Sequence, residues 1–184
     1  MNECYLGSLV EQGFEEFLRI PPYSIRHAIL ETLVQRFHAE TGTFHLSCGE
    51  YVVLPLDWTA ILGLRFDRHP VSIDPIDFAT TSELLGIQYP YTPTRWQYFW
   101  PTYEPQIRME WLKINIPWEA KPDDIAFRQF FFYFIGSCLF GNNRSMLTCK
   151  LLEAMRVVSD IGTYDWESLF LWILHRFHEA GFAM

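Results

Sequence analysis

Histidine and cysteine supply the residue types in this chain that are best suited to metal chemistry. His45 and Cys48 lie three positions apart, and His175 and His178 lie one helical turn apart near the C-terminus. A structural zinc site requires four such ligands, and no C-x-x-C pair accompanies either group. We therefore predict no metal site, and we expect hydrogen-bonded histidines at both places.

Covalent and nucleotide chemistry also lack their usual residues. The only lysines, Lys113, Lys121 and Lys150, all lie in polar surroundings, whereas a Schiff-base enzyme requires a buried lysine beside an acidic or arginine partner. The glycines form neither G-x-G-x-x-G nor a P-loop, and no G-x-S-x-G elbow is present. We predict no catalytic residue and no cofactor, although an enzyme with an unrecognised site remains an alternative.

The charge and hydropathy of the chain argue against two further classes of partner. The net charge is -8 with 14 Lys+Arg, and the positive charges are scattered, so direct nucleic-acid binding is not expected. The most apolar stretch, Phe130 to Leu139, is about half the length of a membrane span. Four widely spaced cysteines without an export signal indicate reduced thiols inside the cell.

Hydrophobic spacing predicts a mainly α-helical, single compact domain. A capping box at Ser8 and Glu11 indicates a first helix that ends near Ile20, before two prolines. Ser24 is placed to cap a second helix, which carries apolar residues as far as Phe37.

One small β-hairpin is predicted near residues 43–54, where apolar and polar residues alternate on both sides of Gly49. Gly49 can supply the positive φ that such a turn often needs. Pro55 and Asp57 then suit the start of a short helix, which Gly63 ends.

Residues 64–105 form the least regular part of the sequence and are interrupted by many prolines. Short helices are expected to start at Asp74-Pro75 and at Ser82-Glu83. The stretch from Tyr89 to Tyr103 is rich in aromatic side chains, among them Trp96, Phe99 and Trp100. We favour a loop that packs its rings on the core, with an aromatic contact surface as the alternative.

Helices are predicted again in the second half of the chain, at 107–114, 122–140, 146–158 and 166–180, with Asp165 as the cap of the last. The helix that ends at Phe140 is apolar on almost every face, so we expect it at the centre of the fold. The predicted core residues are Phe44, Leu46, Val53, Trp58, Ile61, Phe130, Phe134, Leu139, Trp166, Leu169 and Ile173.

Several segments, in order, are similar to the plant mobile domain family. They are the helix end Leu33-Val34-Gln35-Arg36-Phe37, the hairpin from Thr43 to Glu50, the helix from Pro55 to Leu64, Gly136-Ser137 with Leu139-Phe140, and Ile161 to Trp166. The resemblance covers about residues 30–180. Ser47, Glu167 and Leu54 depart from the family's pattern, in which Pro, Gly and a capping Thr are usual.

The resemblance gives ten positions a structural role rather than a catalytic one. They are His45, Cys48, Gly49, Asp57, Gly63, Arg128, Gly136, Gly162, Tyr164 and Trp166. The label "aminotransferase-like" is sometimes attached to the family, but the three lysines give it no support. Because the family's domain continues well past the helix at Trp166, we expect a shortened or partial member.

For function, the resemblance implies a nuclear protein–protein interaction module in transposon silencing, gene expression control and meristem maintenance. The implied partners are phosphatase-like proteins of the PP7 type or longer plant mobile domain proteins. A short form that binds and antagonises a longer relative is an alternative. The chain carries no import signal, so a cytoplasmic location is also compatible with it.

The final predicted helix suggests a homodimer or an obligate complex. Leu169, Ile173 and Phe177 form one apolar stripe, while Phe170 and Trp172 project in other directions. A helix that is apolar on more than one face requires a partner surface. Phe170 and Trp172, with the aromatic loop, are therefore the candidate interface.

Overall fold

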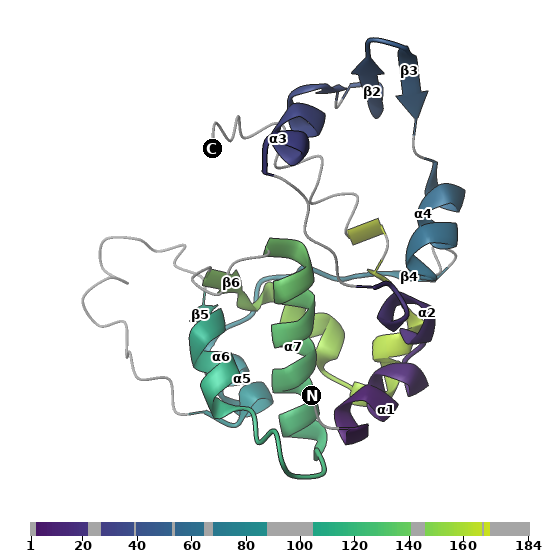
Figure 1. The fold of residues 1–184 in the computed structure, drawn as a ribbon. Helices are drawn as coiled ribbons and strands as arrows, with labels where there is room; N and C mark the ends of the chain where they lie inside the picture. The colour runs from purple at the N-terminus through teal and green to yellow at the C-terminus, as the bar shows by residue number, and fades with distance from the viewer. Residues whose placement is uncertain are drawn as a thin grey trace, which may run out of the picture. The chain divides into compact units, whose positions relative to one another are not determined.

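A computed structural model describes residues 3–21, 27–38, 40–52, 54–64, 68–87, 105–140, 146–166 and 168–169. The chain divides into two compact units, each described here by itself (Figure 1). The first unit comprises Met1–Gln12 and Val71–Tyr164, and the second comprises Gly13–Pro70 and Asp165–Met184.

Helices dominate both units, as the sequence predicts. The α-helices are α1 (Glu3–Glu11), α2 (Glu15–Leu18), α3 (His27–Gln35), α4 (Pro55–Leu62), α5 (Phe78–Leu85), α6 (Met109–Asn115) and α7 (Asp124–Phe140), and the 3-10 helices are η1 (Cys149–Met155) and η2 (Val158–Thr163). The strands are short: β1 (Phe37–His38), β2 (Thr43–Leu46), β3 (Gly49–Val52), β4 (His69–Pro70), β5 (Gln106–Arg108), β6 (Met146–Thr148) and β7 (Tyr164–Asp165). The predicted fold class, mainly α with a small hairpin, is confirmed.

The first unit is built around α7, which has α5 and α6 on one side and α1 on the other (Figure 1). Phe130, Phe131 and Phe132 on three successive positions are all buried, which confirms that this helix is central. Tyr5 of α1 packs on Phe130 with ring centroids 4.7 Å apart. Burial of such large rings supplies the main hydrophobic stabilisation of this unit.

Gly136 allows α7 to approach its neighbours closely. A Cβ atom at this position would overlap side-chain atoms of Leu147 on β6 and of Met109 on α6. Both of those side chains are fully buried, so neither can move aside without opening the core.

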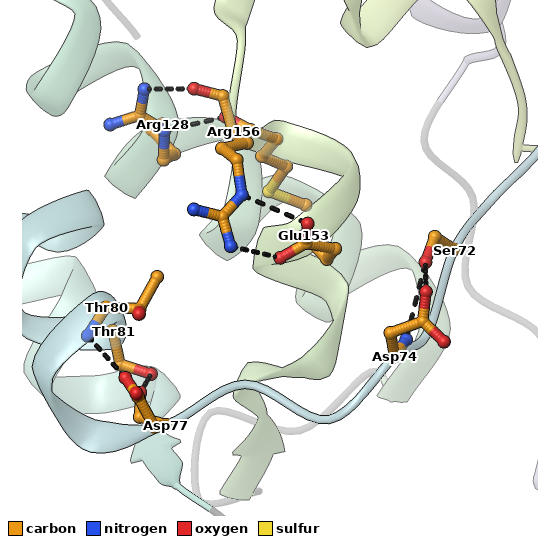
Figure 2. A network of polar contacts seen from close by, with 9 residues as sticks. Ser72, Asp74, Asp77, Thr80, Thr81, Arg128, Glu153 and Arg156 are labelled. Carbon is orange, nitrogen blue, oxygen red and sulfur yellow. Dashed lines mark hydrogen bonds and ion pairs between the residues drawn. The ribbon is translucent and has the colours of Figure 1, made fainter.

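Arg128, on the second turn of α7, is buried and binds the ends of two other helices. Figure 2 shows its hydrogen bonds at the end of η1. Its Nε donates to the Met155 carbonyl at 2.7 Å and its Nη1 to the Leu84 carbonyl at 2.7 Å. Its Nη2 donates to the Arg156 carbonyl at 3.1 Å. These carbonyls belong to the last turn of α5 and to the end of η1, where helical carbonyls lack intrahelical partners.

The charge of Arg128 is balanced mainly by helix ends. The C-terminal end of a helix carries partial negative charge, which favours a cation there. Burial lowers the pKa of Arg128 from its usual value, while the Asp124 carboxylate acts in the opposite direction. The neighbouring Gln129 donates to the Leu85 carbonyl at 2.6 Å, so α7 caps α5 with two side chains.

The second unit contains a three-stranded antiparallel sheet in the order β1-β2-β3. Gly49 begins β3 with φ +143°, as predicted for this hairpin. Gly63 ends α4 in the left-handed region with φ +67°, also as predicted. A Cβ on Gly63 would overlap the Cβ of Glu16 on α2, so this glycine serves both the end of α4 and its packing on α2.

Local structure differs from the sequence prediction in several places. The first helix, predicted to end near Ile20, ends at Glu11, and α2 follows it. Ser8 lies inside α1 and its hydroxyl donates to the Cys4 carbonyl, so the predicted capping box is wrong. Residues 146–158 form β6, η1 and the start of η2 rather than one α-helix. Short helices were predicted to start at Asp74-Pro75 and at Ser82-Glu83, but one helix, α5, begins at Phe78. It is capped by Asp77, whose Oδ1 accepts from the Thr80 amide at 2.7 Å (Figure 2).

The predicted core is confirmed in part. Phe130, Trp166 and Leu169 are buried, whereas Ile61 is 59% exposed and was wrongly placed in the core. Phe44, Leu46 and Phe134 are half-buried. Val53 and Ile173, with the side chains of Trp58 and Leu139, lie outside the described part of the chain.

Replacing Arg128 by Lys should lower the free energy of unfolding by about 2–4 kcal/mol, because an ammonium cannot reach all three buried carbonyls and leaves some unpaired. Urea denaturation followed by circular dichroism measures this loss. The matched control is Arg156→Lys, whose exposed side chain bonds to Glu153 and should change stability by less than about 1 kcal/mol. Equal losses in the two variants would contradict a central role for Arg128.

Candidate functional site

The ten positions with a predicted structural role are distributed over both units. The first unit holds Arg128, Gly136, Gly162 and Tyr164, and the second holds His45, Cys48, Gly49, Asp57, Gly63 and Trp166. The candidate interface residues Trp96, Phe99, Trp100, Phe170 and Trp172 lie outside the described residues, as do His175 and His178.

Asp57 and Gly162, and the neighbouring Asp165, make hydrogen bonds to the main chain or to nearby side chains. The Asp57 carboxylate accepts from the Leu54 amide at 2.9 Å at the start of α4. The Gly162 amide donates to the Gln12 side chain at 2.7 Å. Asp165 accepts from both the amide and the hydroxyl of Ser168, at 2.9 and 2.6 Å, as predicted for a cap.

The sheet of the second unit offers two chemically different faces. Phe37, Phe44 and Tyr51 are paired across the three strands and so lie in one row on one face. Side chains alternate along a strand, so their neighbours His38, Thr43 and the remaining polar residues lie on the other face.

The apolar face remains partly uncovered by the described residues. The rings of Phe37 and Phe44 have centroids 5.0 Å apart, and both residues are half-buried. Tyr51, which continues their row, is 52% exposed. An aromatic row at the surface of a sheet is well suited to contact with another protein.

The polar face carries a connected network of two histidines, a threonine and a glutamate. The rings of His38 and His45 stack with centroids 3.8 Å apart. Glu50 Oε1 lies 3.2 Å from His45 Nε2 and accepts from the Thr43 hydroxyl at 2.7 Å. The pKa of Glu50 is lowered, and the hydrogen bond from Thr43 is the largest cause. The nearby His45 and His38 lower this pKa further.

This network is poorly suited to catalysis or metal binding. A carboxylate whose pKa is lowered is a weaker base than an ordinary one, whereas a general base works best near neutral pKa. Within the described residues, no group of three or more His, Cys, Asp or Glu side chains is arranged to hold a metal ion.

Sequence reasoning missed His38 and Glu50 as members of this network. It assigned Phe37 to a helix, so β1 was not expected and the stacked rings could not be found. Glu50 could have been found, because a two-residue turn at Ser47-Cys48 places it directly opposite His45. Arg36 was also missed, although its side chain donates to the His45 carbonyl at 3.2 Å.

Residues 5–177 match a family model described as a domain of unknown function, DUF8566. The chain belongs to this family. Protein MAIN-LIKE 2 of Arabidopsis thaliana is 30% identical over 180 residues, which cover 91% of this chain and 25% of that relative. Protein MAINTENANCE OF MERISTEMS from the same plant is 27% identical over 92% of this chain and 36% of its own length.

A further relative is the serine/threonine-protein phosphatase 7 long form homolog of Arabidopsis thaliana. It is 26% identical over 91% of this chain, but the match covers only 12% of that protein. These relatives confirm the resemblance to plant mobile domain proteins.

The chain spans about a third or less of the length of the relatives it matches, and no solved structure matches it. No helix among the described residues is long and apolar enough to cross a membrane.

Replacing Thr43 by Val should raise the pKa of Glu50 towards its usual range, because it removes the hydrogen bond that stabilises the carboxylate most. A carboxyl-carbon NMR titration measures this.

In the parent chain, the contribution of Glu50 to stability is present above its unfolded-state pKa. That contribution is lost as pH falls through the lower folded-state value. A smaller change is expected for His45→Gln, and no change in Thr43→Val would show that the hydrogen bond does not form.

Proposed function

We propose that this chain is a non-enzymatic protein–protein interaction module in plant nuclear assemblies. One relative is named for the maintenance of meristems, and we extend to this chain a part in that process, in gene expression control and in transposon silencing. A nuclear location belongs to the same proposal.

The observation that carries this proposal is the number of exposed apolar side chains among the described residues of the second unit. Among the described residues, seven of the thirteen exposed large apolar side chains belong to α3, β3 and α4 of this unit and to the linker before α4: Ile29, Leu33, Tyr51, Val52, Leu54, Leu56 and Ile61. Single exposed apolar residues are normal on monomers, whereas seven of them within three elements of one unit support a contact with another protein there.

Longer family members, including phosphatase-like proteins of the PP7 type, are the partners that we propose. A phosphatase 7 long form homolog shares this region with the chain, so the two proteins would present related surfaces. The same relationship supports a second role, in which the chain competes with a longer relative for that relative's partner. The phosphatase named in that relative lies in a protein of which the chain covers 12%, so its activity is not extended to this chain.

The test uses the purified chain and purified MAIN-LIKE 2 or phosphatase 7 long form homolog. Leu56→Ser combined with Ile61→Ser should weaken binding at least about tenfold, because these side chains are 68% and 59% exposed and would be buried in the complex. Isothermal titration calorimetry measures the dissociation constants. The control is Ile114→Ser, which alters a side chain 73% exposed on α6 of the first unit and should leave binding unchanged.

Two outcomes would contradict this proposal. One is the absence of binding by the parent chain to either relative. The other is binding that the α4 double variant and the Ile114 control change equally, since the second unit would then not be the contact surface.

A further inference from the structure

Strand β3 forms an edge of the sheet, because the strand order is β1-β2-β3. Each of its four residues, from Gly49 to Val52, is exposed. Natural proteins usually protect an edge strand with proline, lysine, a bulge or a covering segment. The sequence of β3 contains neither proline nor lysine, and no strand among the described residues pairs with its outer edge, so this edge is available for pairing.

The hairpin register fixes which backbone groups point outward from this edge. The His45 amide donates to the Arg36 carbonyl at 2.8 Å, on the β1 side of β2. Hydrogen bonding alternates along an antiparallel strand, so Phe44 bonds to its partner Tyr51 on β3. The amides and carbonyls of Glu50 and Val52 therefore point outward, and no hydrogen bond between described residues reaches them.

We propose that two copies of this chain pair through these edges, with β3 antiparallel to β3 of the partner subunit and a two-fold axis at Tyr51. This inference rests on the proposed interaction function and names one partner, a second copy. Glu50 of each subunit then lies opposite Val52 of the partner subunit, and the two residues exchange amide-to-carbonyl hydrogen bonds. Two such pairs satisfy all the outward groups of both residues.

Side-chain chemistry selects this register. A two-fold axis at Tyr51 continues the row Phe37–Phe44–Tyr51 into the same row of the partner subunit. Tyrosines that face each other across such a pair are close enough to pack. An axis at Glu50 would instead place two carboxylates directly opposite each other, which is unfavourable.

The polar face is compatible with the same register. Glu50 is engaged by Thr43 and His45 of its own subunit, and its cross-strand neighbour would be the apolar Val52 of the partner subunit. The contact is small and falls in the class of weak interfaces, below about 1,200 Å² of buried surface. We accordingly expect a weak dimer that forms reversibly.

Charge at the two-fold axis tests this arrangement. Tyr51→Lys and Tyr51→Glu each place two like charges opposite each other and should weaken the dimer at least about tenfold. An equimolar mixture of the two variants pairs Lys with Glu and should restore dimer formation. Sedimentation equilibrium over about 1–200 µM measures this, a range that spans weak dimers of this size class. Ile114→Lys on α6 is the matched control and should leave the dimer unchanged.

A parent chain that is monomeric over this range would overturn the inference. So would a dimer that Tyr51→Lys leaves intact, since its contact would lie elsewhere, or a mixture that fails to restore pairing. Circular dichroism of each variant establishes that it is folded. Binding to the longer relatives is tested at Leu56 and Ile61 of α4, so the proposed function and the β3 dimer can fail independently.

Discussion

The first unit depends on one buried guanidinium. The planar fork of Arg128 reaches three carbonyls at the ends of α5 and η1, and these segments are far apart in the sequence. Without it, the helix ends would bury polar groups that have no partner, at a cost that packing alone cannot offset. Lysine lacks the geometry to replace it, because an ammonium offers its donors from a single atom. The apolar surface of α7 can therefore be buried against α5 and η1 without unpaired backbone groups.

The second unit is organised on a different principle. Its sheet is stabilised by cross-strand contacts, aromatic on one face and polar on the other, and the close approach of Gly63 to Glu16 joins α4 to α2. A small sheet buries little surface of its own. Apolar side chains that a larger core would cover, such as Tyr51 and Leu56, consequently remain exposed. The exposure of these side chains follows from the small size of the sheet. The same exposure makes them available for contact with another protein.

Sequence patterns predicted the elements whose determinants are local. Proline and aspartate at the start of α4 and glycine at its end act within a few residues, as does the alternation of β2 and β3. Arg128 was assigned a structural role, but its three carbonyl partners are invisible to sequence because main-chain groups carry no residue identity. Ile61 was misplaced because α4 is apolar on more than one face, so periodicity does not decide which face is buried. The strand β6 and helix η1 were predicted as one α-helix, since a short apolar run is compatible with the periodicity of a helix and with that of a strand.

The two units together explain why the chain can be rich in apolar residues and poor in recognisable chemistry. In the first unit, the strongest polar arrangement, around Arg128, is directed inward at backbone carbonyls. In the second, the Thr43–Glu50–His45 network has a carboxylate with a lowered pKa, which favours the ionised form and hence fixed hydrogen bonds over proton transfer. Among the described residues, the groups that stay available to the proposed partner are apolar side chains and the backbone of an edge strand. Such groups recognise shape and register rather than charge, which agrees with a chain of net charge -8 that carries no basic cluster.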